Sequence, residues 1–143
     1  MPQGFASEIL LAGANLTNAS VVVGVPGGCI PCITTLPPGY RFIELNGFPQ
    51  SVVLVGPRIR VLAQVLNGAN LAGMALNGST FSGTNLFGAQ MQNVDLTNAT
   101  FSRASLWAAD LTGANLTGVT WNDTTCPDTT NSDANGNTCI GHL

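Results

Sequence analysis

Few side chains in this sequence could take part in chemistry, and several of them lie near its C-terminus. The segment Asn131-x-Asp133-x-Asn135-Gly136 matches the first half of a calcium-binding loop, in which oxygen ligands alternate and a glycine allows a sharp turn. The twelfth loop position should be a bidentate Glu, and here it is His142. The missing carboxylate favours an Asx-rich turn that bonds its own backbone. We therefore predict no metal site, with calcium at Asn131, Asp133 and Asn135 as the alternative.

His142 is the single histidine, and from the tail it cannot assemble a Ser–His–Asp triad or a metal cluster. The seven acidic residues are scattered along the chain, so paired catalytic carboxylates are not expected. The net charge is −3 and there is no lysine, which leaves no basic stripe for nucleic acid. The sequence thus predicts no enzyme activity, no catalytic residues, no cofactor and no nucleic-acid partner.

The four cysteines form two local pairs, Cys29/Cys32 and Cys126/Cys139. One Cys-x-x-Cys pair cannot complete a zinc site, and Cys29–Cys32 lacks the βαβ context of a redox motif. We expect Cys29 and Cys32 to form a local disulfide or a bridge between chains. Paired cysteines with sparse charge favour an extracellular or cell-surface location. The apolar run Val21–Val25 is too short to span a membrane, and any secretion signal is expected upstream of Met1.

The elements that must position these groups are set by a repeat of five residues. A period of five fits neither a helix nor a strand, but it fits a chain that turns a corner every five residues. Four corners close a coil of 20 residues, with a large and a small residue inside and Gly or Asn near each corner. The large inward residues are Val61, Leu66, Leu71, Leu76, Phe81, Leu86, Met91, Leu96, Phe101, Leu106, Leu111, Leu116 and Trp121.

Spacing the sequence at 20 residues sorts the inward residues by chemistry. Phe81, Phe101 and Trp121 fall in one column above Val61, and the other three columns are aliphatic. A bare period of five would not require that segregation. The predicted core stack is therefore Phe81, Phe101 and Trp121, with Leu86 and Leu106, Leu71, Met91 and Leu111, and Leu76, Leu96 and Leu116. Coils are expected about 4.8 Å apart, the usual strand spacing.

Two units, Ala69-Asn70-Leu71-Ala72-Gly73 and Ala114-Asn115-Leu116-Thr117-Gly118, show the repeat clearly. They resemble the A(D/N)LxG unit of the pentapeptide-repeat family. The resemblance covers Val61–Trp121 and extends to Ala14-Asn15-Leu16-Thr17-Asn18 near the N-terminus. It implies an all-β fold, a right-handed quadrilateral β-helix, and a solenoid without catalytic activity.

Residues 22–60 interrupt the repeat. Tyr40–Leu45 and Ser51–Val55, separated by Asn46-Gly47-Phe48-Pro49, predict a β-hairpin. This stretch resembles the LPxGY…LVGP segment that joins blocks of pentapeptides in large secreted bacterial proteins. We expect the insertion to form a bulge on the side of the solenoid.

The segment Trp121–Leu143 resembles the tail that ends many such bacterial proteins. It implies a Cys126–Cys139 disulfide closing a loop that caps the last coil, which would stabilise the fold by about 3 kcal/mol. The chain is thus predicted to be one solenoid domain, 1–143. Its parts are the N-terminal repeats (1–21), the insertion (22–60), the main solenoid (61–121) and the capping loop (122–143).

Two outward columns could form contact surfaces. Phe87 and Trp107 each follow an inward residue and lie one coil apart. They would form an apolar patch for a partner or another copy, unless the insertion folds over them. Thr80, Thr100 and Thr120 form a second column, which suggests ice binding or simply the preference of threonine for strands.

The ends of the solenoid suggest its function. Unpaired strand edges must be capped or stacked, and Met1–Leu10 offers only a short apolar segment as an N-terminal cap. We therefore predict an extracellular structural module that self-assembles head to tail into a filament, or forms part of a longer secreted rod. The alternative is a protein- or glycan-binding module that uses Phe87 and Trp107. A gyrase-protecting DNA mimic, which the family resemblance also suggests, is disfavoured because acidic rows are missing.

Overall fold

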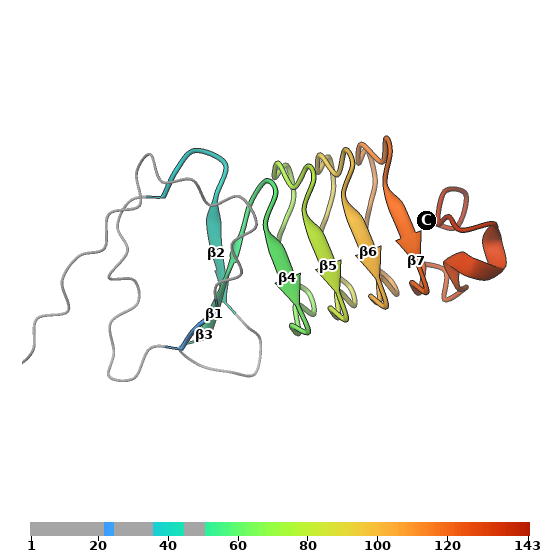
Figure 1. Cartoon of the computed structure of the whole chain (residues 1–143), viewed down its shortest axis with the longest axis horizontal. Coiled ribbons are helices and arrows are strands. Elements are labelled where there is room, and N and C mark those ends of the chain that lie inside the picture. Colours follow the sequence, from blue (N-terminus) through green and yellow to red (C-terminus); the bar gives the residue numbers. More distant parts are fainter. Residues whose placement is uncertain (1–21, 25–35, 45–50) are drawn as a thin grey trace, which may run out of the picture.

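The computed structural model describes residues 22–24, 36–44 and 51–143. These residues are all-β apart from one short 3-10 helix, η1 (Ser132–Asn135). A three-stranded antiparallel sheet has the order β1-β3-β2, with β1 (Val22–Gly24), β2 (Arg41–Glu44) and β3 (Ser51–Val55). A four-stranded parallel sheet contains β4 (Arg60–Leu62), β5 (Thr80–Ser82), β6 (Thr100–Ser102) and β7 (Thr120–Asn122) in chain order. Figure 1 shows β4 to β7 as successive coils along the long axis.

The parallel strands pair in a register of 20 residues, because Val61 lies beside Phe81, Phe81 beside Phe101, and Phe101 beside Trp121. Three more positions in each coil form bridges with the same 20-residue offset: Val65–Asn85–Ser105–Thr125, Asn70–Gln90–Asp110 and Ala75–Asp95–Asn115. The coils are therefore hydrogen-bonded to one another all around, as in a β-helix solenoid. The 20-residue coil predicted from the sequence is confirmed.

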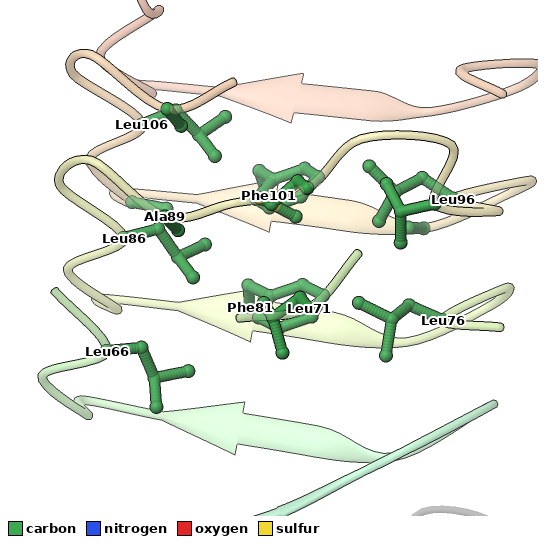
Figure 2. Close-up of a cluster of buried hydrophobic side chains, with 14 of the residues drawn as sticks. Leu66, Leu71, Leu76, Phe81, Leu86, Ala89, Leu96, Phe101 and Leu106 are labelled. Atoms are coloured by element: carbon green, nitrogen blue, oxygen red, sulfur yellow. The ribbon is translucent and has the colours of Figure 1, made fainter. Parts of the chain in front are cut away.

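The core runs along the solenoid axis as columns of like side chains. The Phe81 and Phe101 rings stack with centroids 5.0 Å apart, and Phe101 and Trp121 stack at 5.1 Å. Figure 2 shows Leu66, Leu86 and Leu106 in one such column and Leu76 and Leu96 in another. Ten of the eleven predicted core residues are buried, and Leu116 is half-buried. Each buried Leu or Phe contributes about 1.5–3 kcal/mol from apolar surface removed from water.

The small inward residues fill the space between these columns, and two of them are polar. Ser79 donates its hydroxyl to the C=O of Gly56 (2.7 Å) and accepts from the N–H of Ile59 (3.2 Å). Thr84 donates to the C=O of Val61 (3.0 Å). Both hydroxyls therefore bond to backbone groups where the chain enters the solenoid. These hydrogen bonds offset the free-energy cost of burying the two polar side chains.

The corners of the coil have the left-handed backbone that the Gly and Asn positions predict. Gly118 has φ 68°, and an added Cβ there would clash with Oδ1 of Asn98 one coil below. Arg103 and Ala108 occupy the same kind of corner at φ 51° and 56° without the freedom of glycine. These two corners therefore carry backbone strain that a glycine would relieve.

The three-stranded sheet lies at the N-terminal end of the solenoid, next to β4 (Figure 1). β2 and β3 pair antiparallel, as the hairpin prediction requires, and their connection lies outside the described residues. Val53 and Val55 are buried in the same core as the solenoid. The ring of Tyr40 covers Gly56, and its hydroxyl donates to the C=O of Pro57 (2.9 Å).

The expected bulge on the side of the solenoid is not confirmed, because the described part of the insertion, β2 and β3, lies at the N-terminal end (Figure 1). The apolar residues of β3 continue the core beyond its first coil, so they bury more surface at the end than they would on the polar side. β1, which no sequence pattern predicted, pairs with β3 on the side opposite β2. The predicted repeat at residues 11–21 lies outside the described residues.

Candidate interaction surfaces

The C-terminal end of the solenoid is open along the segment 109–119 among the described residues. In the coil below, the N–H groups of Met91, Asn93, Leu96 and Asn98 each donate to a C=O of the last coil at 2.8–2.9 Å. Their counterparts one coil on are Leu111, Gly113, Leu116 and Gly118. Within the described part of the chain, these four N–H groups have no acceptor, and the C=O groups of Ala109 and Ala114 have no donor. We call the segment 109–119 the open edge.

The apolar side chains of the open edge are correspondingly less buried. Ala114, Leu116 and Val119 are only partly buried, although they occupy the same inward positions as residues that are fully buried in lower coils. At the other end, Val61, Leu66, Leu71 and Leu76 are at most 1 % exposed. The first coil is thus covered, and the last coil is covered only in part. Below the cap, the buried Nε1 of Trp121 has no acceptor among the described residues.

The C-terminal loop covers the part of this end that includes β7. The disulfide between Cys126 and Cys139 predicted from the sequence is present, with Cα atoms 5.4 Å apart, and both residues are completely buried. The loop satisfies donors of the last coil. The N–H of Asp123 donates to Oδ1 of Asp133 (2.8 Å), and that of Thr124 donates to Oγ of Ser132 (3.1 Å). This loop therefore caps the coil above Trp121, where β7 ends (Figure 1).

The calcium candidates Asn131, Asp133 and Asn135 lie in this cap and bond to the protein. Oδ1 of Asn131 accepts from the N–H of Asp133 (2.9 Å) at the start of η1. The amide of Asn135 donates to Oγ1 of Thr130 (2.6 Å). These contacts are those of an Asx turn and a capped 3-10 helix. In the part of the chain that the structure describes, no group of three His, Cys, Asp or Glu residues is placed to hold a metal ion.

His142 contacts Asp128, with Nδ1 2.8 Å from Oδ2 of the carboxylate. The Thr130 hydroxyl and N–H both donate to Asp128, and together with His142 they lower the pKa of this carboxyl to about 2. The pair is exposed and ties the chain end to the cap. Asp95 and Asp110 also have lowered pKa values, because Thr97 and Thr112 donate to them. Each of these carboxylates accepts from the N–H two residues further along the chain and so stabilises its own turn.

Phe87 and Trp107 form an exposed aromatic pair on the side of the solenoid. Their side chains are 40 % and 51 % exposed, and their ring centroids are 5.0 Å apart with a tilt of 57°. The described part of the insertion therefore does not cover them. Val65, 38 % exposed, lies on the same face beside Asn85.

The remaining candidates separate into two groups. Cys29 and Cys32 lie outside the described residues. Thr80, Thr100 and Thr120 are paired side by side in the parallel sheet and form one column, as the repeat predicts. No helix among the described residues is long and apolar enough to cross a membrane.

The comparison with protein families gives one match. Residues 65–103 and 91–118 match the family described as pentapeptide repeats, in eight copies. Residues 65–118 of the solenoid consist of pentapeptide repeats. The matched repeats span coils in which every inward column is regular, and they end at the open edge. The insertion-type and tail-type resemblances suggested by the sequence lie outside this match.

Two solved structures are similar over part of this chain. HetL, a pentapeptide repeat protein involved in heterocyst differentiation regulation from the cyanobacterium Nostoc sp. strain PCC 7120, is 28 % identical, with a TM-score of 0.48. That alignment covers 51 % of this chain and 34 % of HetL, so the chain spans about a third of that protein. Rfr23 from the cyanobacterium Cyanothece 51142 is 21 % identical over 57 % of this chain and 71 % of its own, with a TM-score of 0.29. No curated protein matches.

Proposed function

We propose that this chain is a non-enzymatic structural module that associates with further copies through the open edge. The single observation that carries the proposal is the row of backbone groups on Leu111, Gly113, Leu116 and Gly118 that lack partners among the described residues. An unpaired strand edge beside half-buried apolar side chains is a template for pairing with another chain. The backbone of a second solenoid turns a corner every five residues as well, so its backbone groups would match the spacing of those at the open edge.

Three further features support this proposal. The right-handed, four-sided solenoid that the family resemblance implies would present a flat end, on which another chain can stack. The Cys126–Cys139 disulfide supports an extracellular or cell-surface location, since such bonds persist in oxidising compartments. The few charges of the chain leave little repulsion between copies.

The test is electron microscopy and sedimentation of the purified chain over a range of concentrations, with and without reductant. Ala114→Lys places a charged side chain at the open edge, where it blocks pairing. Thr112→Lys is the matched control, because Thr112 is exposed on the side of the same coil. We expect assemblies of the unmodified chain and of Thr112→Lys, and dispersed particles of Ala114→Lys. Monomers of the unmodified chain at every concentration would contradict the proposal.

A second candidate function is a binding module that uses Phe87 and Trp107. The specific observation is their exposure as a contacting pair on a face without a covering element among the described residues. Exposed aromatic pairs are enriched at contact surfaces for proteins and other ligands. Phe87→Ser with Trp107→Ser should then abolish capture of a protein or glycan partner while the circular dichroism spectrum stays unchanged. Capture that persists in this variant would exclude the aromatic pair.

A further inference from the structure

The charged residues of this chain are separated along the solenoid axis. Three of the four arginines, Arg41, Arg58 and Arg60, lie at the N-terminal end, and all three are exposed. The acidic residues of the last coil and the cap, Asp110, Asp123, Asp128 and Asp133, are exposed as well. Among the described residues at the N-terminal end, the only acid is Glu44 in β2. Among the described residues, the N-terminal end therefore carries mainly cations and the C-terminal end mainly anions.

The two ends also differ in what their backbones offer. The open edge presents N–H and C=O groups next to Asp110. At the N-terminal end, β2 pairs with β3 on one side, and within the described ranges its other side has no partner strand. β2 begins at Arg41, so a strand edge and a cation lie at the same place. Within the described residues, each end thus has an edge without a partner, and the charges beside the two edges are opposite.

A contact between two C-terminal ends would bring the anionic residues together. A contact between an N-terminal end and a C-terminal end places arginine opposite aspartate. Complementary charge of this kind steers encounter and fixes which surfaces meet, while like charges opposed across an interface cost free energy. The contact is heterologous, so it repeats from copy to copy.

We propose that the copies join head to tail, with the anionic C-terminal end of one copy against the arginine-bearing N-terminal end of the next. This inference rests on the proposed function, because it names the partner surface for the open edge. The partner is a second copy of this chain, received at the sheet formed by β1, β2 and β3. Arg41, Arg58 and Arg60 face Asp110, Asp123 and the other acids of the cap across the joint.

The experiment measures self-association by sedimentation at 0.05 M and 1 M NaCl. Screening shortens the Debye length to about 3 Å at 1 M, so we expect the association constant to fall at least about tenfold. Arg58→Asn with Arg60→Thr removes two cations and installs the residue types found at the same positions in later coils, Asn98 and Thr80. Asp110→Asn with Asp123→Asn removes two anions and keeps the Oδ1 atoms that accept from the N–H of Thr112 and from the side-chain amide of Asn131. We expect each double variant to weaken association about tenfold or more at 0.05 M NaCl, and to reduce the salt dependence.

The control is Asp95→Asn with Arg103→Asn, which removes one charge of each sign outside the two edges proposed to meet. Asn115, one coil above Asp95, already accepts the turn bond through its amide oxygen, so asparagine suits position 95. Asn93 and Asn98 have the same left-handed backbone as Arg103, so asparagine suits position 103, and the variant should fold. We expect its association constant to match that of the unmodified chain. Micrographs should show particles joined end to end.

The outcomes separate this inference from the proposed function. A chain that stays monomeric at both salt concentrations contradicts both. Association that is unchanged or stronger at 1 M NaCl, or that survives both end variants, contradicts the head-to-tail charge pairing and leaves association through the open edge standing. Particles joined side by side would contradict the end-to-end geometry.

Discussion

The two ends of the solenoid differ in how completely they are covered. Val61, Leu66, Leu71 and Leu76 in the first coil are at most 1 % exposed, because the chain that precedes the solenoid continues the core. In the last coil, only the part below the disulfide-closed loop is covered, and Leu116, outside that part, remains partly exposed. Each coil of a solenoid contacts only its neighbours, so a residue at an open end loses half of its partners. Residues at the same repeat position therefore differ in burial and packing according to the coil in which they lie.

The largest expected effect compares one column at two heights. Leu96 is completely buried, and Leu116 occupies the same column at the open edge. Leu96→Ala should lower the free energy of unfolding by about 2–5 kcal/mol, because it leaves a cavity between two packed coils. Leu116→Ala should cost about 1 kcal/mol or less in the dilute monomer, since water already reaches the site. Urea unfolding measures both losses of stability. Equal losses would contradict the claim that Leu116 is less tightly packed than Leu96.

The next effect tests the covered part of the C-terminal end. Cys126→Ser with Cys139→Ser removes a link that spans 13 residues, and should lower the free energy of unfolding by about 3 kcal/mol. Exposure of Trp121 should accompany the loss, because this side chain is 4 % exposed beneath the cap. Tryptophan fluorescence and urea unfolding report the two changes. A variant with full stability and an unchanged spectrum would show that the loop does not cap the coil.

A smaller effect concerns the corners. Ala108 has φ 56°, so Ala108→Gly should raise the free energy of unfolding by up to about 1 kcal/mol. Gly118→Ala should lower it by about 1 kcal/mol or more, because φ is 68° and the new Cβ meets Asn98. Thermal unfolding of the two variants gives opposite shifts in Tm. Shifts of the same sign would contradict the corner assignment.

The smallest effect is the acid dependence of the cap. The pKa of Asp128 is lowered to about 2, so the ionised carboxylate is favoured in the folded state. Its contribution is fully present above the unfolded pKa of about 3.9, and it is lost as the pH falls toward 2. Asp128→Asn keeps the acceptor for Thr130 and removes this dependence. Stability measured between pH 5 and pH 2 should therefore fall less steeply in the variant, and identical slopes would exclude Asp128 as the cause.

The repeat could be predicted from the sequence because its period is local and is repeated many times. The columns of Phe81, Phe101 and Trp121, the corners at Gly and Asn, and the Cys126–Cys139 bond follow from spacing and resemblance. The pairing of β1 with β3 could not be predicted from the sequence. β1 has only three residues and lies far from β3 in the chain, so its pattern does not indicate a partner.

The open edge could not be predicted either. Ala114-Asn115-Leu116-Thr117-Gly118 is among the clearest repeats, and nothing in its letters distinguishes it from a buried one. Its exposure follows from what happens later. The chain leaves the coil after Cys126 and folds back, so residues that would lie above Leu111 and Leu116 are used in the cap instead. Whether a repeat lies at an open end depends on the coils that follow it, and the sequence of that repeat alone does not show it.

The most direct test of the account is amide hydrogen exchange at the open edge, measured by NMR at low and high protein concentration. The N–H groups of Leu111, Gly113, Leu116 and Gly118 should exchange quickly in the dilute monomer, and those of Met91, Asn93, Leu96 and Asn98 slowly. As copies associate, the first set should become protected while the second stays unchanged. Fast exchange of the first set at every concentration, with assembly taking place, would show that the open edge does not join the copies.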